Sequence, residues 1–312
     1  MPLKCKKKVR FLPNPLRIIN MNLYLNISSA RKSMKKNLGQ ANHFLITILI
    51  GLDGVLKHDL ECPEDFSTSW NPKDKKRSVE RSREFALKSA LAWAVDCLDS
   101  YFIACNKKPF LIDNRDFKKD LDGANRSVYE KHRIFSSFVQ ADSKILKVYY
   151  SMVFWAIQWR NNTTHCEAEN KLDEDCRQIL IESGEDINTI FCGLDINCCL
   201  EHFDRRKIPT FKEVTSMIHA IQLCVEDIDH YLLKELDLNR YAKEIIEVFF
   251  HENSQEKVLF KNLKECRKIS KITTILRNHS FTDKPLSVVA LMNGNKCLDS
   301  QIIKVISDSM IK

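Results

Sequence analysis

The chain has 312 residues, more than one hydrophobic core usually organises, so we expect a main domain with a smaller appendage. With only 7 glycines and 8 prolines, the composition excludes folds built on glycine-rich nucleotide loops and favours an all-α protein. The net charge of +8 and pI near 8.8 are compatible with a polyanionic partner.

The N-terminal segment and the cysteines suggest a cellular compartment. The basic segment 1–21 is followed by no signal-peptide core, and we recognise no apolar run long enough to cross a membrane. The 12 cysteines show no pattern of a disulfide-stapled scaffold, so reduced thiols are expected. We therefore expect a cytoplasmic protein without membrane contact.

Two long amphipathic helices are predicted in the first third of the chain. The first covers residues 38–59, with a buried stripe of Leu38, Ala41, Leu45, Ile48, Leu52 and Val55. Asn71 as N-cap and Pro72 at the first helical position open the second, which reaches Cys105. Its stripe is Leu87, Leu91, Ala94, Leu98 and Tyr101. The two helices should pack antiparallel.

The middle of the chain contains the third long helix. Residues 106–124 are expected to be irregular and 128–139 to form a short helix. Asp142 is the expected cap of the long helix that follows. Two adjacent apolar stripes predict that half of its circumference is buried. These stripes are Ile145, Tyr149, Met152, Ala156 and Trp159, and Leu146, Tyr150, Val153 and Ile157.

Further helix is predicted over 172–205, around Gly184, before a fourth long helix. Thr210 and Glu213 form a capping box that opens this helix just after Pro209. Its apolar stripe is Val214, Ile218, Ile221, Val225, Ile228 and Leu232. Four long helices with matching faces predict a four-helix bundle with added helices.

These patterns divide the chain into three expected parts. Residues 1–21 are a basic extension, residues 22–236 contain the bundle, and residues 237–312 form a small, mostly helical C-terminal unit. Within that unit the pattern predicts helices over 239–251 and 255–277, followed by a mixed tail.

Arg160, Asn161 and His165 lie where the apolar pattern of the third long helix ends. Histidine titrates near neutral pH and can act as a general base or acid. Arginine offers a fixed fork of donors to phosphate oxygens, and an asparagine can hold the phosphate or orient the imidazole. This set suits cleavage of RNA, in which the 2′-hydroxyl attacks the adjacent phosphorus without a metal ion.

The stretch from Arg160 to His165, RNNTTH, resembles the R-x(4–6)-H signature of HEPN-domain ribonucleases, including the polar residue after the arginine. The resemblance implies a helical bundle, metal-independent cleavage of single-stranded RNA with no cofactor, and a homodimer that brings two motifs together. Many relatives are toxins or antiviral-defence effectors, which implies an antitoxin or other regulatory partner. The similarity covers the bundle and leaves the C-terminal unit unexplained.

Three alternatives to this interpretation remain. Arg126 and His132 also match the spacing, although serine follows the arginine and the segment is less apolar. Arg160 and His165 would equally suit a helix C-terminus, where cations meet the negative end of the helix dipole. A non-catalytic helical module that binds RNA or a protein would keep the same fold.

Other polar clusters suggest RNA contacts or a metal site. Lysines and arginines crowd the start of the second helix, and more lysines recur at helical spacing in the C-terminal unit. The residues predicted to contact RNA are Lys73, Lys76, Arg77, Lys261, Lys264, Lys268 and Lys271. A solvated helix face would look the same. Cys192, Cys198 and Cys199 near His202 are more typical of small buried residues than of a zinc site, so no metal is expected.

Overall fold

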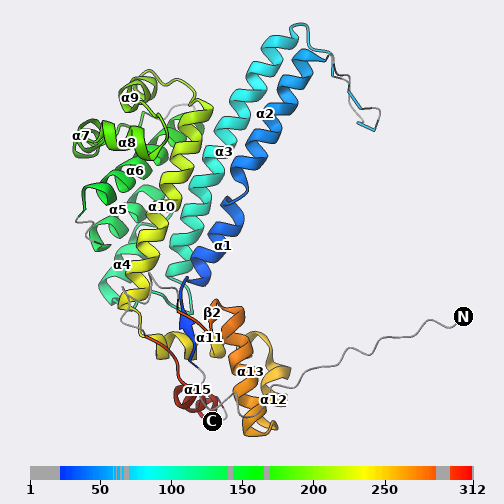
Figure 1. The fold of residues 1–312 in the computed structure, drawn as a ribbon, viewed down its shortest axis with the longest axis vertical. Helices are drawn as coiled ribbons and strands as arrows, with labels where there is room; N and C mark the ends of the chain where they lie inside the picture. The colour runs from blue at the N-terminus through cyan, green and yellow to red at the C-terminus, as the bar shows by residue number, and fades with distance from the viewer. Residues whose placement is uncertain are drawn as a thin grey trace, which may run out of the picture. The chain divides into compact units, whose positions relative to one another are not determined.

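The computed structural model of the protein describes residues 22–58, 60, 62–63, 65–66, 70–139, 143–164, 169–285 and 296–310. This part of the chain is mostly helical, with one short two-stranded antiparallel pair, which confirms the all-α class (Figure 1). The chain divides into two compact units. The larger contains residues 29–107 and 112–232, and the smaller contains the described parts of 1–28, 108–111 and 233–312.

The larger unit begins with α1 (Ser29–Leu38), α2 (Ala41–Lys57) and α3 (Lys75–Cys105), and both α1 and α2 pack against α3 (Figure 1). The prediction of one helix over 38–59 is wrong because the chain turns at Gly39. A Cβ atom there would lie 2.5 Å from the Lys35 carbonyl oxygen, so this turn requires glycine. The predicted stripe also fails at Ile48, which is exposed while its neighbour Leu49 is buried.

The long helix α3 begins later than predicted. Asp74, not Asn71, is the N-cap, and its Oδ1 accepts a hydrogen bond from the Arg77 backbone N–H at 2.9 Å. The apolar stripe of this helix is confirmed, since every member is buried: Leu87, Leu91, Ala94, Leu98 and Tyr101.

Three helices follow: α4 (Arg115–Gly123), α5 (Val128–Val139) and α6 (Lys144–Thr164). The irregular stretch predicted over 106–124 is wrong for α4, which the side chain of Asn114 caps. Asp142, the predicted cap of α6, lies outside the described residues, and Ser143 Oγ accepts the Leu146 N–H at 3.1 Å. Most of the two predicted α6 stripes are buried, while Ile145 is exposed.

The unit is completed by α7 (Glu174–Glu182), α8 (Gly184–Ile190), α9 (Ile196–Asp204) and most of α10 (Phe211–Glu235). The capping box is confirmed: the Thr210 N–H donates to Glu213 Oε2 at 2.6 Å, and the Glu213 N–H donates to Thr210 Oγ1 at 3.3 Å. The predicted α10 stripe is buried along its whole length. The core therefore lies between α3, α6 and α10, whose buried faces are the longest.

The smaller unit contains β1 (Tyr24–Leu25), β2 (Phe281–Thr282), α11 (Leu238–Glu252), α12 (Ser254–Lys261), α13 (Glu265–Asn278) and α15 (Ser300–Ser309). The two strands pair antiparallel, with Tyr24 opposite Thr282. The continuous helix predicted over 255–277 is wrong, because residues 262–264 separate α12 from α13.

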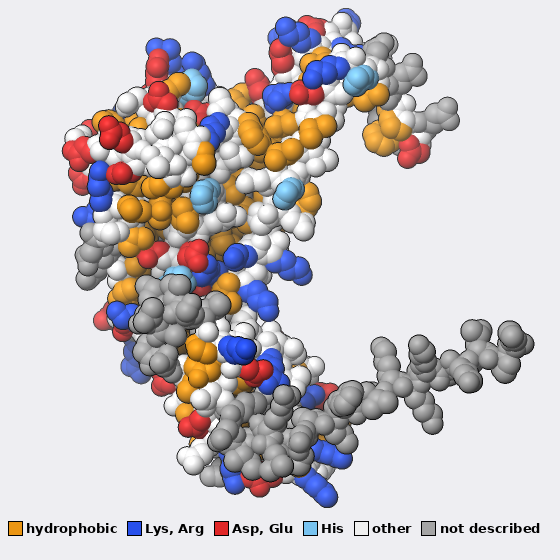
Figure 2. Space-filling view, in the orientation of Figure 1, with side chains coloured by type: hydrophobic (Ala, Val, Ile, Leu, Met, Phe, Trp, Pro, Cys, Tyr) orange, Lys and Arg blue, Asp and Glu red, His pale blue; other side chains and the backbone are white. Residues whose placement is uncertain are grey.

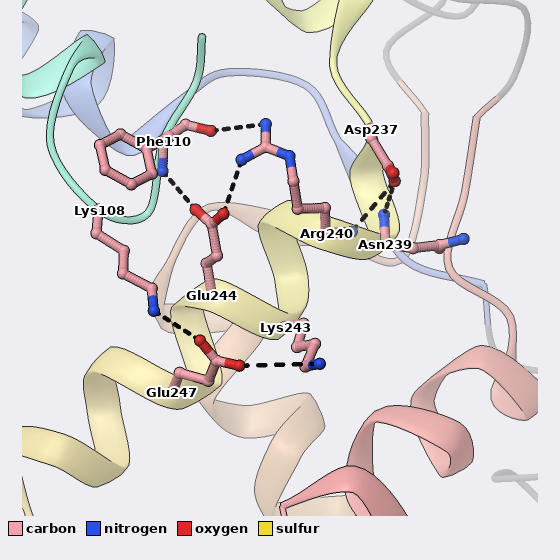
Figure 3. A network of polar contacts seen from close by, with 8 residues as sticks. All are labelled: Lys108, Phe110, Asp237, Asn239, Arg240, Lys243, Glu244 and Glu247. Carbon is pink, nitrogen blue, oxygen red and sulfur yellow. Dashed lines mark hydrogen bonds and ion pairs between the residues drawn. The ribbon is translucent and has the colours of Figure 1, made fainter. Parts of the chain in front are cut away.

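Residues 108–111 lie in the sequence between the two segments of the larger unit, but they belong to the smaller unit, where they contact α11 (Figure 3). The Glu244 carboxylate accepts the Phe110 backbone N–H at 2.7 Å, and Arg240 donates to the Phe110 carbonyl oxygen at 3.1 Å. Lys108 pairs with Glu247 at 2.7 Å. Charge-assisted bonds of this kind are stronger than neutral ones, so they hold the segment against α11.

A titration prediction follows from His132, which is buried in the larger unit between Phe102, Tyr150 and Phe154. Burial lowers the pKa of His132 from 6.5 to about 4. At pH values between about 4 and 6.5, His132 is protonated in the unfolded chain but neutral in the folded chain. Above pH 6.5, His132 should therefore not lower the free energy of unfolding. As the pH drops from 6.5 towards about 4, the free energy of unfolding should fall.

The expected slope is at most about 1.4 kcal/mol per pH unit. Chemical denaturation at a series of pH values measures it, with His132→Gln as the comparison, because glutamine does not titrate. Equal slopes for the two proteins would show that His132 is not the group responsible.

Candidate active site at the end of α6

The backbone at Arg160 is fixed by the most deeply buried part of α6. Trp155 and Trp159 are both buried, with ring centroids 4.8 Å apart. The Trp159 indole N–H donates to the Lys207 carbonyl oxygen at 3.0 Å, just before α10 begins. Since two large buried rings and a part-buried hydrogen bond hold this turn, the position of Arg160 is set by the core.

The Arg160 side chain is half-buried, and its buried Nε–H has no hydrogen-bond partner among the described residues. The ion pairs between described residues do not include Arg160. Leaving a donor of a charged group unpaired in a buried position costs about 1–3 kcal/mol or more. An anion that accepts from this guanidinium would remove that cost.

Two threonine hydroxyls bond to backbone carbonyl groups near the end of α6. The hydroxyl of Thr164 donates to the Arg160 carbonyl oxygen at 2.8 Å, and Thr163 donates to the same oxygen and to that of Trp159, both at 3.0 Å. Both carbonyl groups lie before the last four of α6, which are the ones without an intrahelical donor, so these bonds leave the helix-capping alternative open.

Asn161 and its neighbour Asn162 differ in their contacts. Among the described residues, the Asn161 side chain makes a single long contact, 3.4 Å from its Nδ2 to Gln158 Oε1. Asn162, which sequence reasoning missed, accepts the Asn170 backbone N–H and donates to the Asn170 carbonyl oxygen, each at 2.8 Å. His165 falls within residues 165–168, outside the described part of the chain. The structure thus places Arg160 and Asn161 on the last turn of α6 and joins the two flanks of the His165 segment.

A polar pocket of about 340 Å³ opens beside this junction, lined by Asn162, Asn170, Arg177, Phe203 and Arg206 among others. Arg206 pairs with Glu169 at 2.7 Å, and Arg177 pairs with Asp204. The pocket was not predicted, because its residues come from α6, α7, α9 and the adjoining loops. The only signal in the sequence was the Arg205-Arg206 pair.

The first group of predicted RNA contacts lies at the start of α3. Lys73, Lys76 and Arg77 are exposed. Lys73 and Arg77 line a shallow pocket of about 550 Å³ together with Arg81 and Phe85. No ion pair between described residues involves these three cations. They remain available to an anionic partner.

The second group comes from two helices of the smaller unit. Lys261 ends α12, Lys264 precedes α13, and both are exposed. Lys268 lies 5.9 Å from the centre of the Phe260 ring, and Lys271 pairs with Glu256 at 2.9 Å. Lys261 and Lys264 are therefore the members of the group whose charge is most available.

The structure does not support a site at the Arg126 and His132 pair or a metal site at the cysteine cluster near His202. His132 is fully buried, with Nε2 3.0 Å from the Tyr150 carbonyl oxygen, so the Arg126 and His132 pair does not form an accessible site. Within the described ranges no group of three or more His, Cys, Asp or Glu side chains could hold a metal ion. Cys199 is buried, and burial raises the pKa of its thiol.

Two further findings concern the whole chain. By length and composition alone, the helical stretch Ser29–Lys57 is apolar enough to cross a membrane, and 22% of its most apolar window is buried. A core helix of a soluble protein passes the same criterion, so the expected absence of membrane contact stays a prediction. Comparison with protein-family models, curated proteins and solved structures finds no match.

Proposed function

We propose that the protein is a metal-independent endoribonuclease of HEPN type that cleaves single-stranded RNA. The observation that carries the proposal is the guanidinium of Arg160, which is held by the core, half-buried and left with an unpaired donor. A phosphate group matches that donor in charge and geometry. The all-α larger unit, with long helices α3, α6 and α10, supports a HEPN-like bundle.

In this proposal Arg160 stabilises the negative charge that develops on the phosphate oxygens as the 2′-hydroxyl attacks. His165 removes the proton of that hydroxyl or returns one to the leaving oxygen. Asn161, whose amide makes only one long contact, orients the phosphate or the imidazole. The products are a 2′,3′-cyclic phosphate and a 5′-hydroxyl end.

The test uses the full chain with labelled single-stranded RNA and a DNA strand of the same sequence, both in the presence of EDTA. RNA cleavage that leaves cyclic-phosphate ends is expected, while the DNA stays intact because it lacks the attacking hydroxyl. Cleavage of both strands, or loss of cleavage in EDTA, would contradict the proposed chemistry.

The proposal includes a homodimer. The exposed surface of helices α2 and α3, together called the α2–α3 hairpin, supports the dimer. Figure 2 shows hydrophobic side chains gathered over this hairpin. Seven large apolar side chains of these helices are between 41% and 73% exposed: Phe44, Ile46, Ile48, Ile50, Leu56, Phe85 and Trp93. On α2, Phe44 and Ile48 lie on one side of the buried stripe and Ile46 and Ile50 on the other, so a second copy would cover one of these two sides.

Replacing Ile48 by aspartate should convert a dimer into a monomer at micromolar concentration, because the charge would be buried without a partner. Light scattering after size-exclusion chromatography measures the mass. Val258→Asp, at another exposed apolar position, on α12, is the control and should leave the mass unchanged. A parent protein that is already monomeric would refute the dimer.

The biological role we propose is that of a cytoplasmic toxin or antiviral-defence effector, held in check by an antitoxin or another regulatory protein. This part comes from the family resemblance of the segment from Arg160 to His165. Expression in a bacterial host tests it. Growth should stop on induction of the parent and continue on induction of Arg160→Ala.

The second candidate function is a non-catalytic module that binds RNA through its basic surfaces. Three exposed cations at the start of α3 favour it: Lys73, Lys76 and Arg77. None of them forms an ion pair with another described residue. The module predicts that Lys76→Ala combined with Arg77→Ala weakens RNA binding and lowers its salt dependence, with no cleavage by any form. Cleavage by the parent that is lost with Arg160 excludes it.

A further inference from the structure

Helix α9 holds a cysteine and a histidine one turn apart, Cys198 and His202. The Cys198 thiol is exposed, and its Sγ lies 3.7 Å from His202 Nε2. Both residues belong to the larger unit, and neither takes part in the proposed RNA cleavage. A thiol within hydrogen-bond reach of an imidazole is the arrangement in which a cysteine becomes a nucleophile.

The other nitrogen of the same imidazole faces a buried carboxylate. His202 Nδ1 lies 2.9 Å from Glu213 Oε1, and the Glu213 side chain is only 4% exposed. The second carboxylate oxygen accepts the Thr210 N–H, so the capping box of α10 fixes the carboxylate. This contact assigns the imidazole proton to Nδ1 and leaves the Nε2 lone pair facing the Cys198 thiol.

We propose that Cys198, His202 and Glu213 form a reactive thiol centre that is oxidised by hydroperoxides. The Cys198 proton passes to His202 Nε2, and the thiolate attacks one oxygen of the peroxide. An S–O bond forms as the O–O bond breaks, and the departing oxygen takes the proton back from the imidazole to leave as water or an alcohol. Sulfur loses two electrons and becomes a sulfenic acid, while the peroxide is reduced.

The surroundings favour this reaction over acyl transfer. The backbone N–H groups of Asn197 and Cys198 at the start of α9 both donate to the Asp195 side chain, at 3.0 and 3.2 Å. Because these donors are occupied, they cannot form an oxyanion hole for an acyl intermediate. Attack on a peroxide needs no such hole, since the leaving group requires only the proton that His202 carries.

The neighbouring cysteine does not share this reactivity. Cys199 is buried, and burial together with the Glu213 carboxylate raises the pKa of its thiol. Cys266 on α13 is an exposed thiol for which no hydrogen bond to a histidine is found among the described residues. Cys266 is therefore the internal reference for an exposed but unassisted thiol.

The test treats the full chain with hydrogen peroxide near neutral pH in the presence of EDTA, traps sulfenic acid with dimedone, and quantifies each cysteine by peptide mass spectrometry. Cys198 should be labelled about tenfold faster than Cys266, and His202→Gln should lower the Cys198 rate to that of Cys266. The Cys266 rate and the circular dichroism spectrum of the variant report whether its fold is intact.

Two results would overturn the proposal. Equal rates for Cys198 and Cys266 in the parent would show that His202 does not assist the thiol, and this result needs no variant to fold. Labelling that appears only when EDTA is present would show instead that Cys198 and His202 hold a metal ion. Iodoacetamide in place of peroxide gives an independent measure of nucleophilicity and should yield the same ratio.

Discussion

Arg160→Ala should lower kcat for RNA cleavage by about 10² to 10³, the usual effect of removing one donor from a site that stabilises an oxyanion. The reason is that the Arg160 guanidinium lies at the end of α6 with a buried Nε–H that has no partner in the described part of the chain. Single-turnover kinetics with saturating RNA separates this effect from binding. His165→Ala should cost about 10² to 10⁴, the contribution of general acid–base catalysis.

Controls for this prediction come from the same chain. Arg160→Lys keeps the charge but loses the forked geometry and should recover only part of the rate. Arg126→Ala removes the exposed arginine of the other spacing match and should leave cleavage unchanged. Loss of activity in Arg126→Ala with full activity in Arg160→Ala would place the site elsewhere.

Asp99→Ala should destabilise the fold by about 3 kcal/mol, because it leaves Lys131 buried without a partner. The two side chains form an ion pair at 2.7 Å that links α3 to α5, and Lys131 is only 6% exposed. Urea denaturation monitored by circular dichroism measures the loss. Asp99 thus stabilises the fold through this ion pair.

A rescue variant separates an unpaired charge from lost packing. Lys131→Met keeps the length of the side chain and removes its charge, so Asp99→Ala combined with Lys131→Met should be more stable than Asp99→Ala alone. No recovery in the double variant would mean that Asp99 stabilises the fold through contacts other than this ion pair.

The long helices could be predicted because their burial repeats with the helical period. In α10 every predicted stripe residue is buried, and the capping box marks where the helix starts. The prediction failed where one glycine decides the path of the chain. Gly39 ends α1 and permits the turn into α2, but nothing in the local pattern distinguishes it from a helical glycine.

The candidate site could be predicted only along one segment of the chain. The RNNTTH motif located Arg160 and Asn161, since they are adjacent in the sequence. The contact of Asn162 with Asn170 and the pairing of His202 with Glu213 join different segments, so no spacing rule reveals them. The exposure of Ile48 was also unpredictable, because an apolar residue at a free surface looks like a core residue in sequence.

The attachment of residues 108–111 to α11 has a consequence for how the protein can be divided. The chain enters and leaves the smaller unit in mid-sequence, so neither unit corresponds to one uninterrupted piece of polypeptide. A protein shortened after residue 236 would lose Arg240, Glu244 and Glu247, and with them the partners of Lys108 and Phe110. A gene fragment that spans the larger unit, residues 29–232, would therefore carry residues 108–111 without their partners on α11.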